Sequence, residues 1–341
     1  MSRPESDSPR PTLRQIAART GVSVMTVSRA LRNSPLVTEP LRERIKKTAQ
    51  KLGYRPDPEL ARLMKRLRRN KKSSYVATLA AISSVEKGME PRTLLTTWTS
   101  AQARAEELGY RLELFRPKTP TEFNRQLQRT LVNRGIEGVL LLQMTYPSDV
   151  GALLDWEKFS VVAASPSVIH HAFPQVGANY YHNARLLCAE LARRGCARIG
   201  FVSTSTFCVR TDDAFRVATA WHNLRAPAPP PAPLIASSRL PSRGELLAWL
   251  AREKPDGVIA HSPESAAFVA EHIAASGAPR PFLACTNVDP DTTRFPGVDE
   301  RREQIGRNAV DLLAGLVARG EKSDRASPIG ILVNGRWTEP R

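Results

Sequence analysis

Long apolar segments are missing from this sequence. No run of about 18 consecutive apolar residues, the length that a membrane-spanning helix needs, occurs in the chain. Met1–Pro11 is polar and rich in Pro, Ser and Arg, without the apolar core of a secretory signal. We therefore expect a soluble, cytoplasmic protein without a membrane partner, in which residues 1–11 form a disordered leader.

Cysteine is scarce, with four residues at positions 188, 196, 208 and 285. None of them forms a CxxC motif or a Cys/His spacing typical of a zinc site. His170 and His171 are the one close pair of histidines, and adjacent side chains point apart on a strand or helix. We expect buried thiols in a reducing compartment and no metal site.

The short motifs of common enzyme classes are absent as well. The chain has no GxSxG, no P-loop and no HExxH, and its glycines form no GxGxxG. We therefore expect that the protein is not an enzyme and carries no cofactor.

Acidic residues are few relative to basic ones, and the imbalance is concentrated at one end. The chain has 50 Lys and Arg against 33 Asp and Glu, a formal net charge of +17. Residues 1–72 hold 19 basic and 6 acidic residues, whereas the rest of the chain holds 31 and 27. A basic head on a nearly neutral body predicts that a polyanion binds the N-terminal region.

Three short helices are predicted in this basic region. Thr12 is a suitable N-cap for the first, Gly21 ends it, and Ser23 can cap the second. The third begins at Thr38 and ends near Gly53. The spacing of Ala17, Gly21 and Val27 is that of a helix-turn-helix, whose second helix enters the major groove of DNA.

The polar face of the second predicted helix suits contacts with DNA. The hydroxyls of Ser23, Thr26 and Ser28 can reach phosphate oxygens, or can instead cap the helix and face solvent. Val24 and Met25 lie at the helix start, where they can contact thymine methyl groups. Arg29 can bind a guanine through two hydrogen bonds or contact a phosphate.

After Ser74 the pattern changes to alternating strands and helices. Eight apolar runs predict strands, and seven amphipathic segments between them predict helices. This alternation is typical of an α/β architecture with parallel strands, in which two open sheets and one barrel both remain possible. The stretch "APAPPPAP" at 226–233 predicts an extended surface loop.

The N-terminal segment "TLRQIAARTGVSVMTVSRALRNSPLVTEPLRERIKKTAQKLGYRP", residues 12–56, resembles the LacI/GalR family of transcription regulators. The core "GVSxxTVSRxL" is highly specific to that family. The resemblance implies an all-α helix-turn-helix head at 12–56, a hinge helix and linker at 57–74, and a periplasmic-binding-protein-like core at 75–341. This core would consist of two α/β subdomains with parallel sheets and a ligand cleft between them.

The resemblance also implies where the chain crosses between the subdomains and how it acts. We expect subdomain one at 75–175 and 296–320, and subdomain two at 176–295 and 321–341. Family members act as dimers on near-palindromic operators, mostly as repressors, and their affinity is tuned by a small molecule.

Site residues follow from the residue pattern and the resemblance together. The resemblance places Val24, Met25 and Arg29 at base-reading positions, and Leu63 at the hinge leucine that wedges into the minor groove, with Leu60 as the second choice. The candidate DNA contacts are Thr12, Ser23, Val24, Met25, Thr26, Ser28, Arg29, Leu60 and Leu63.

The body departs from the family pattern in ways that disfavour a sugar or purine effector. Asn179-Tyr180 stands where Asp-Asn is usual, and Cys196 where His is usual. Because ligands of parallel α/β folds bind beyond the carboxyl ends of strands, strand ends supply the candidate effector contacts. These are Ser83, Gln143, Ser165, Arg210, Asp213, Glu264 and Asp289.

The prediction is a dimeric, sequence-specific repressor that binds double-stranded operator DNA. Three alternatives remain: a DNA-binding regulator whose divergent core has no sugar effector, an architectural protein that coats DNA by charge alone, and a ligand sensor with a vestigial head.

Overall fold

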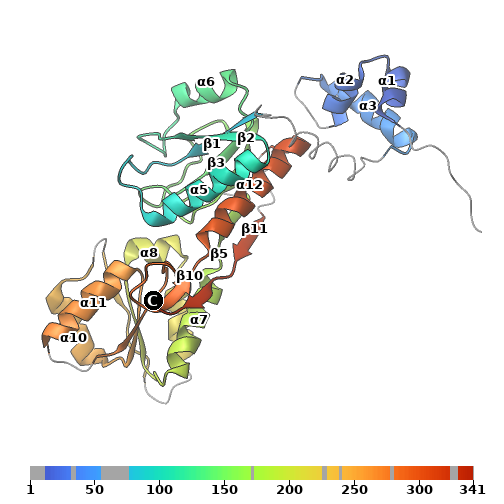
Figure 1. Cartoon of the computed structure of the whole chain (residues 1–341). Helices are drawn as coiled ribbons and strands as arrows, with labels where there is room; N and C mark the ends of the chain where they lie inside the picture. The colour runs from blue at the N-terminus through green and yellow to red at the C-terminus, as the bar shows by residue number, and fades with distance from the viewer. Residues whose placement is uncertain are drawn as a thin grey trace, which may run out of the picture.

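The computed structural model describes residues 12–31, 36–54, 77–169, 173–224, 229–237, 240–276, 280–322 and 329–340. These residues form a head of three helices and two α/β subdomains, which lie one above the other in Figure 1. The predicted leader, the hinge with Leu60 and Leu63, and His170-His171 lie outside the described residues.

The head contains α1 (Leu13–Thr20), α2 (Val24–Leu31) and α3 (Glu39–Lys51). Thr12 and Gln15 form a capping box at the start of α1, and Gly21 ends that helix in the left-handed conformation at φ 68°. The three helices pack around Ile16, Val27 and Ile45, which are completely buried. The predicted helix-turn-helix core is therefore present in the head.

Six strands form the sheet of the first subdomain, in the spatial order β11-β5-β4-β3-β1-β2, and all their pairings are parallel. They are β1 (Ala77–Ile82), β2 (Tyr110–Phe115), β3 (Gly138–Leu141), β4 (Ser160–Ala163), β5 (Gln175–Ala178) and β11 (Gly330–Val333).

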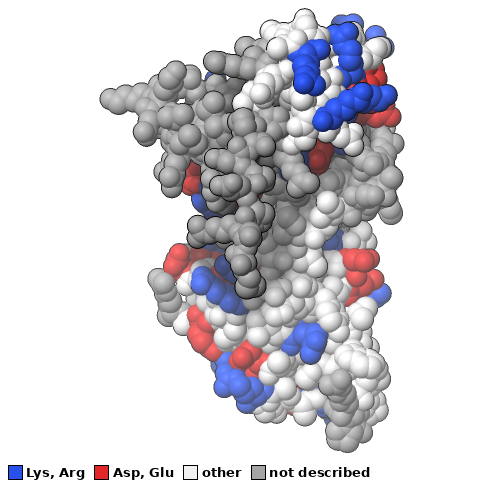
Figure 2. Space-filling view, turned by 90° about the vertical axis from the view of Figure 1, so that its right-hand side faces the viewer, with Lys and Arg blue, Asp and Glu red and all other residues white. Residues whose placement is uncertain are grey.

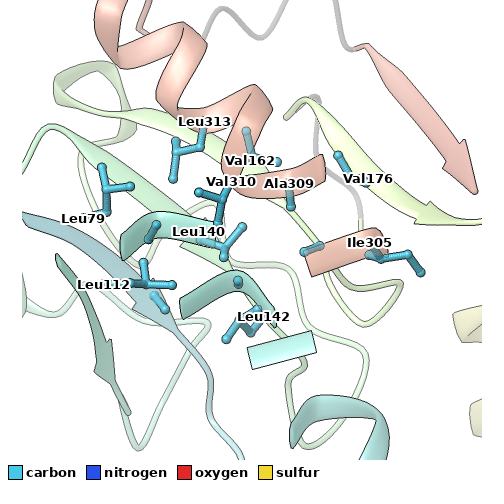
Figure 3. Packing of buried hydrophobic residues seen from close by; sticks show 14 of the residues in the cluster. Leu79, Leu112, Leu140, Leu142, Val162, Val176, Ile305, Ala309, Val310 and Leu313 are labelled. Carbon is cyan, nitrogen blue, oxygen red and sulfur yellow. The ribbon is translucent and has the colours of Figure 1, made fainter. Parts of the chain in front are cut away.

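Helices cover both faces of this sheet because successive strand residues point to opposite sides. Leu79 and Ala81 of β1 pack beneath α5 (Arg92–Glu107) and α12 (Arg302–Arg319). Ala80 and Ile82 face α6 (Arg125–Asn133) and the short 3₁₀ turn η1 (Trp156–Lys158). Figure 3 shows the first of these clusters, with residues of α12 lying over Leu140, Val162 and their neighbours.

The second subdomain repeats the plan with the strand order β12-β10-β9-β8-β6-β7. The strands are β6 (Ile199–Thr204), β7 (Leu234–Ala236), β8 (Gly257–Ala260), β9 (Phe282–Cys285), β10 (Gly297–Asp299) and β12 (Arg336–Thr338). The helices are α7 (Tyr180–Arg193), α8 (Ser205–Arg210), α9 (Ala214–Asn223), α10 (Arg243–Glu253) and α11 (Pro263–Ser276). β12 alone among the described strands pairs antiparallel, with β10.

Two open sheets and no barrel are thus present in the described body, so the prediction of a head on a core of two mainly parallel sheets is confirmed. The eight predicted strands are all found, but four short ones were missed: β5, β7, β10 and β12. Each of the four has only three or four residues, and none was marked by a long apolar run in the sequence. The predicted helix 210–224 is interrupted at Asp212 and Asp213, both with positive φ.

The positions predicted for the crossings between subdomains need correction. β5 lies in the first sheet, so the first crossing follows residue 178 rather than 175; β10 lies in the second sheet, so the return follows 299 rather than 295. Placing all of 321–341 in subdomain two was wrong, because β11 pairs with β5. A strand such as "GILV" is equally compatible with either sheet, and only the pairing partner decides.

The four cysteines are free and buried, which confirms the prediction for the thiols. No helix within the described residues combines the length and the apolar character needed to cross a bilayer.

Close packing of α12 on α5 depends on Gly306. A Cβ at this position would collide with the Thr97 carbonyl oxygen and the Ser100 hydroxyl of α5. On the same helix, a Cβ at Gly315 would meet only the end of the flexible Arg319 side chain, at 3.1 Å.

We expect Gly306→Ala to lower the free energy of unfolding by about 1–3 kcal/mol, because the helices must separate. Gly315→Ala is the matched control and should raise stability by up to ~1 kcal/mol through helix propensity. Urea unfolding of the full chain measures both changes. Equal effects of the two substitutions would mean that α12 does not need the close contact.

Candidate DNA-binding surface and ligand cleft

The start of α2 is held by the side chain of Ser23, which directly precedes the helix. Ser23 Oγ accepts a hydrogen bond from the Thr26 backbone N–H at 3.1 Å and lies 2.9 Å from Thr26 Oγ1. The Ser23 hydroxyl therefore caps α2 and is bonded to the Thr26 hydroxyl, and Thr12 likewise caps α1. A hydroxyl has further hydrogen-bonding capacity, so contacts of these three residues with phosphates stay predictions.

The faces of α2 are separated by polarity. Val27 and Ala30 are completely buried against the other two helices, whereas Arg29 is exposed. Val24, Met25 and Ser28 lie on α2, but their side chains are outside the described part. Arg29 is thus available for a ligand outside the head.

Positive charge dominates the described head. Its residues include eight Lys or Arg and two Glu. Figure 2, which views the molecule from the side where the head lies, shows Lys and Arg side chains gathered at its upper end. Arg44 also has a structural role, since Nη2 donates to the Thr20 carbonyl at 2.8 Å and joins α3 to α1. Such a surface suits the phosphates of a nucleic acid.

A cleft of about 1060 Å³ lies between the two subdomains. Its walls come from segments that follow the carboxyl ends of strands in both sheets and from the start of α12. Five of the seven predicted effector residues line it: Gln143, Ser165, Arg210, Glu264 and Asp289. The strand-end rule therefore located the cleft, while binding by these residues is untested.

The other two predicted effector residues, Ser83 and Asp213, do not line the cleft. Ser83 is completely buried and donates from Oγ to the Gln143 carbonyl oxygen at 2.5 Å, so it holds the backbone of a lining residue. Asp213 pairs with Arg216 at 2.9 Å. A strand-end position predicts the neighbourhood of a cleft, but the direction of the side chain is decided by local packing.

Two arginine side chains form contacts that join the two subdomains at this cleft. Arg92 of α5 forms an ion pair with Asp289 beyond β9. Arg210, the last residue of α8, donates from Nη2 to the Thr145 carbonyl oxygen at 2.8 Å. The relative position of the two subdomains is thus coupled to the charged groups of the cleft.

Charged and phenolic residues that the sequence reasoning missed also line the cleft, among them Tyr180, His261, Glu300 and Arg302. Burial raises the pKa of Glu300 above its ordinary range, opposed by the ion pair with Arg302, whose own pKa is also raised. Burial raises the pKa of Tyr180 to about 12, so its hydroxyl stays protonated at neutral pH. Tyr180 follows β5 directly, so recognition of that strand would have found it.

Burial also lowers the pKa of His261, which favours a neutral imidazole. Within the described residues, no group of three or more His, Cys, Asp or Glu is placed to hold a metal ion. The cleft is therefore built for polar and ionic contacts with a ligand.

The sequence of the head matches a known family of DNA-binding domains. Residues 12–57 match the family described as bacterial regulatory proteins, lacI family. The head is therefore a lacI-family DNA-binding domain, and the chain that carries it is similar to LacI/GalR regulators. This protein is a DNA-binding transcriptional regulator, with a helix-turn-helix head and a periplasmic-binding-protein-like core.

Similar proteins extend this likeness over almost the whole length of the chain. The HTH-type transcriptional regulator GntR of Pseudomonas aeruginosa is 26% identical over 360 residues, covering 96% of this chain and 95% of the relative. GntR of Escherichia coli K12 is 24% identical over 195 residues, 57% of this chain and 55% of that protein. Both relatives are named as regulators and neither as an enzyme.

Solved structures with the same fold include a transcriptional regulator CelR in complex with cellobiose, at 19% identity and a TM-score of 0.54. That match covers 96% of this chain and 98% of the other. The lac repressor dimer bound to operator and the anti-inducer ONPF matches at 15% identity and a TM-score of 0.55, over 97% and 98% of the two chains.

Proposed function

We propose that this protein is a LacI/GalR-family repressor that binds a near-palindromic operator as a homodimer, and that a small molecule in the cleft tunes its affinity for DNA. The observation that carries the first part is the head, in which a packed three-helix core presents the exposed Arg29 on a basic surface. A two-fold symmetric operator follows if two heads are held by paired bodies.

Regulation by a small molecule is supported by the position of the cleft. Both subdomains contribute to its walls, and the contacts of Arg92 and Arg210 join them across it. A ligand that prefers one arrangement of the subdomains shifts the equilibrium between arrangements by its difference in affinity. The link from this equilibrium to the two heads runs through residues 55–76, which are outside the described part.

The test of specific binding is selection of binding sites from random double-stranded DNA by the full-length protein. We expect a motif with two inverted half-sites. Sequences that share no half-site would contradict the proposal and favour the architectural alternative, in which charge alone binds DNA. Light scattering of the complex with one operator duplex measures its mass and tests whether two chains bind one duplex.

Arg29→Ala is expected to reduce the ratio of specific to non-specific affinity about 5- to 100-fold, because a bidentate base contact contributes ~1–3 kcal/mol of discrimination. Arg19→Ala removes an equally exposed arginine from α1 and is the matched control. It should weaken binding to all sequences alike or not at all. Titrations of both variants with operator and with scrambled DNA measure these affinities. If Arg29→Ala loses equal affinity for both DNAs, Arg29 contacts a phosphate and not a base.

Binding should also weaken steeply as salt is raised, because each neutralised phosphate releases counterions. A plot of log affinity against log salt measures the slope. A flat response would contradict a phosphate-binding head.

A further inference from the structure

Arg210 lies in the cleft without a carboxylate partner among the described residues, as do the exposed Arg294 and Arg301. The other inward arginines of the cleft are paired: Arg92 with Asp289, Arg302 with Glu300, and Arg336 with Asp299 at 3.0 Å. Arg210 forms no ion pair with any described carboxylate. The titratable groups that act on its pKa are the Tyr180 phenol, which is neutral at this pH, and a second cation, Arg302.

The environment of Arg210 disfavours its positive charge. The side chain is half-buried, and desolvation together with the charge of Arg302 lowers its pKa. Nη2 is used by the Thr145 carbonyl, while the buried Nε has no hydrogen-bond partner among the described residues. A buried donor without an acceptor is costly, and an anion would satisfy both the donor and the charge.

Other unsatisfied groups lie on the same walls. Within the described part, Arg302 Nε and His261 Nδ1 are buried and lack hydrogen-bond partners, and the buried Tyr180 hydroxyl has the Arg302 side chain beside it. Two of them are donors at neutral pH, because Arg302 stays charged and the pKa of Tyr180 is about 12. The cleft thus offers an excess of donors, which an acceptor-rich ligand would use.

Because the carboxylates of Glu264 and Glu303 also line the cleft, an anion with a single negative charge suits it better than a dianion. A carboxylate carries one negative charge at neutral pH, whereas a phosphate monoester carries between one and two. Exposed Arg294 and Arg301 stand at the rim, where water already solvates them. The hydroxyl and amide groups of Thr93, Gln143 and Ser165 line the cleft as well and suit hydroxyl groups of a ligand.

From this geometry we infer that the cleft takes a small hydroxylated monocarboxylate, whose carboxylate binds Arg210. The inference rests on the proposed function, because it names the chemical class of the molecule that tunes DNA binding. It also gives Arg210 a second role. The same guanidinium holds the Thr145 backbone of the other subdomain, so binding of the carboxylate changes a contact between subdomains.

The test uses matched probes on the full-length protein. The carboxylates lactate, glycerate, glucuronate and galacturonate are compared with the neutral glycerol, glucose and galactose, and with glycerol 3-phosphate and glucose 6-phosphate. Thermal unfolding and titration calorimetry measure binding. We expect at least one carboxylate to raise the melting temperature and to bind at least about tenfold more tightly than its neutral and phosphorylated counterparts.

Variants connect this binding to the residue. Arg210→Met should weaken carboxylate binding at least about tenfold, whereas Arg210→Lys, which keeps the charge without the guanidinium fork, should retain part of it. Arg243→Met removes an exposed arginine of α10, outside the cleft, and should leave binding unchanged. Failure of every carboxylate to bind, equal binding of a neutral or phosphorylated counterpart, or unchanged binding by Arg210→Met would each overturn the inference.

Operator binding measured on the same preparations separates the two proposals. If the protein binds specific DNA but no carboxylate, the proposed DNA-binding function stands and the proposed ligand class is wrong. If the protein binds a carboxylate but selects no DNA motif, the proposed ligand site stands and the proposed function as a specific DNA-binding regulator is wrong.

Discussion

Ile45→Ala is expected to unfold the head and to abolish specific DNA binding, while the two subdomains stay folded. Ile45 is completely buried at the centre of the three helices, beside Ile16 and Val27. Removing such a side chain costs about 2–5 kcal/mol through lost transfer energy and the cavity left behind. Because the head has few residues, its free energy of unfolding is small, and such a loss is enough to unfold it.

The measurements are operator titration, limited proteolysis and thermal unfolding of the full-length variant. We expect loss of specific binding and rapid cleavage within residues 12–54, with an unchanged melting transition of the body. Gln50→Ala, an exposed position on the same helix, is the control and should behave as the wild type. Operator binding by Ile45→Ala at wild-type affinity would mean that the head does not depend on this core.

Arg302→Met is expected to destabilise the body by about 3–5 kcal/mol, because it leaves the Glu300 carboxylate buried without its cation. Glu300 is 1% exposed, and Arg302 is its ion-pair partner in the described structure. The matched control is Arg319→Met at the other end of α12, which breaks the solvent-exposed pair with Glu321. An exposed pair contributes ~0–1 kcal/mol, so the control should stay close to the wild type.

The pH dependence of this loss follows from the pKa of Glu300. Burial already raises that pKa, and removal of Arg302 raises it further, above the value in the unfolded chain. A raised carboxyl pKa lowers stability at pH values above the unfolded pKa, so the deficit of Arg302→Met should shrink as the pH falls toward about 4. Urea unfolding across pH measures it. A deficit that stays constant with pH, or a variant no less stable than the Arg319→Met control, would contradict the assigned role.

The head could be predicted almost completely, because its signals are local. A capping residue, a glycine with positive φ and apolar residues three or four positions apart specify each helix within a few neighbours of the chain. Thr12, Gly21 and Val27 therefore have the positions that the pattern predicted. The direction of the described Arg29 side chain likewise follows from helix periodicity.

The cleft could be predicted only in part. Gln143, Ser165 and Asp289 were found because polar residues directly after apolar strands mark the carboxyl edge of a parallel sheet. Glu300 and Arg302 were missed because they follow β10, a three-residue strand without a recognisable pattern. The unneutralised charge of Arg210 has no local signal at all, since it depends on which carboxylates of distant segments lie near it.

By itself, then, the sequence determined the three helices of the head, the concentration of positive charge there, and the alternation of strands and helices in the body. These depend on interactions between residues a few positions apart. Tertiary structure alone decided which sheet receives β11, where the chain crosses between subdomains, and which arginines of the cleft are paired. Such features arise from strand pairings and ion pairs between segments far apart in the chain, whose free energies do not depend on the neighbouring sequence.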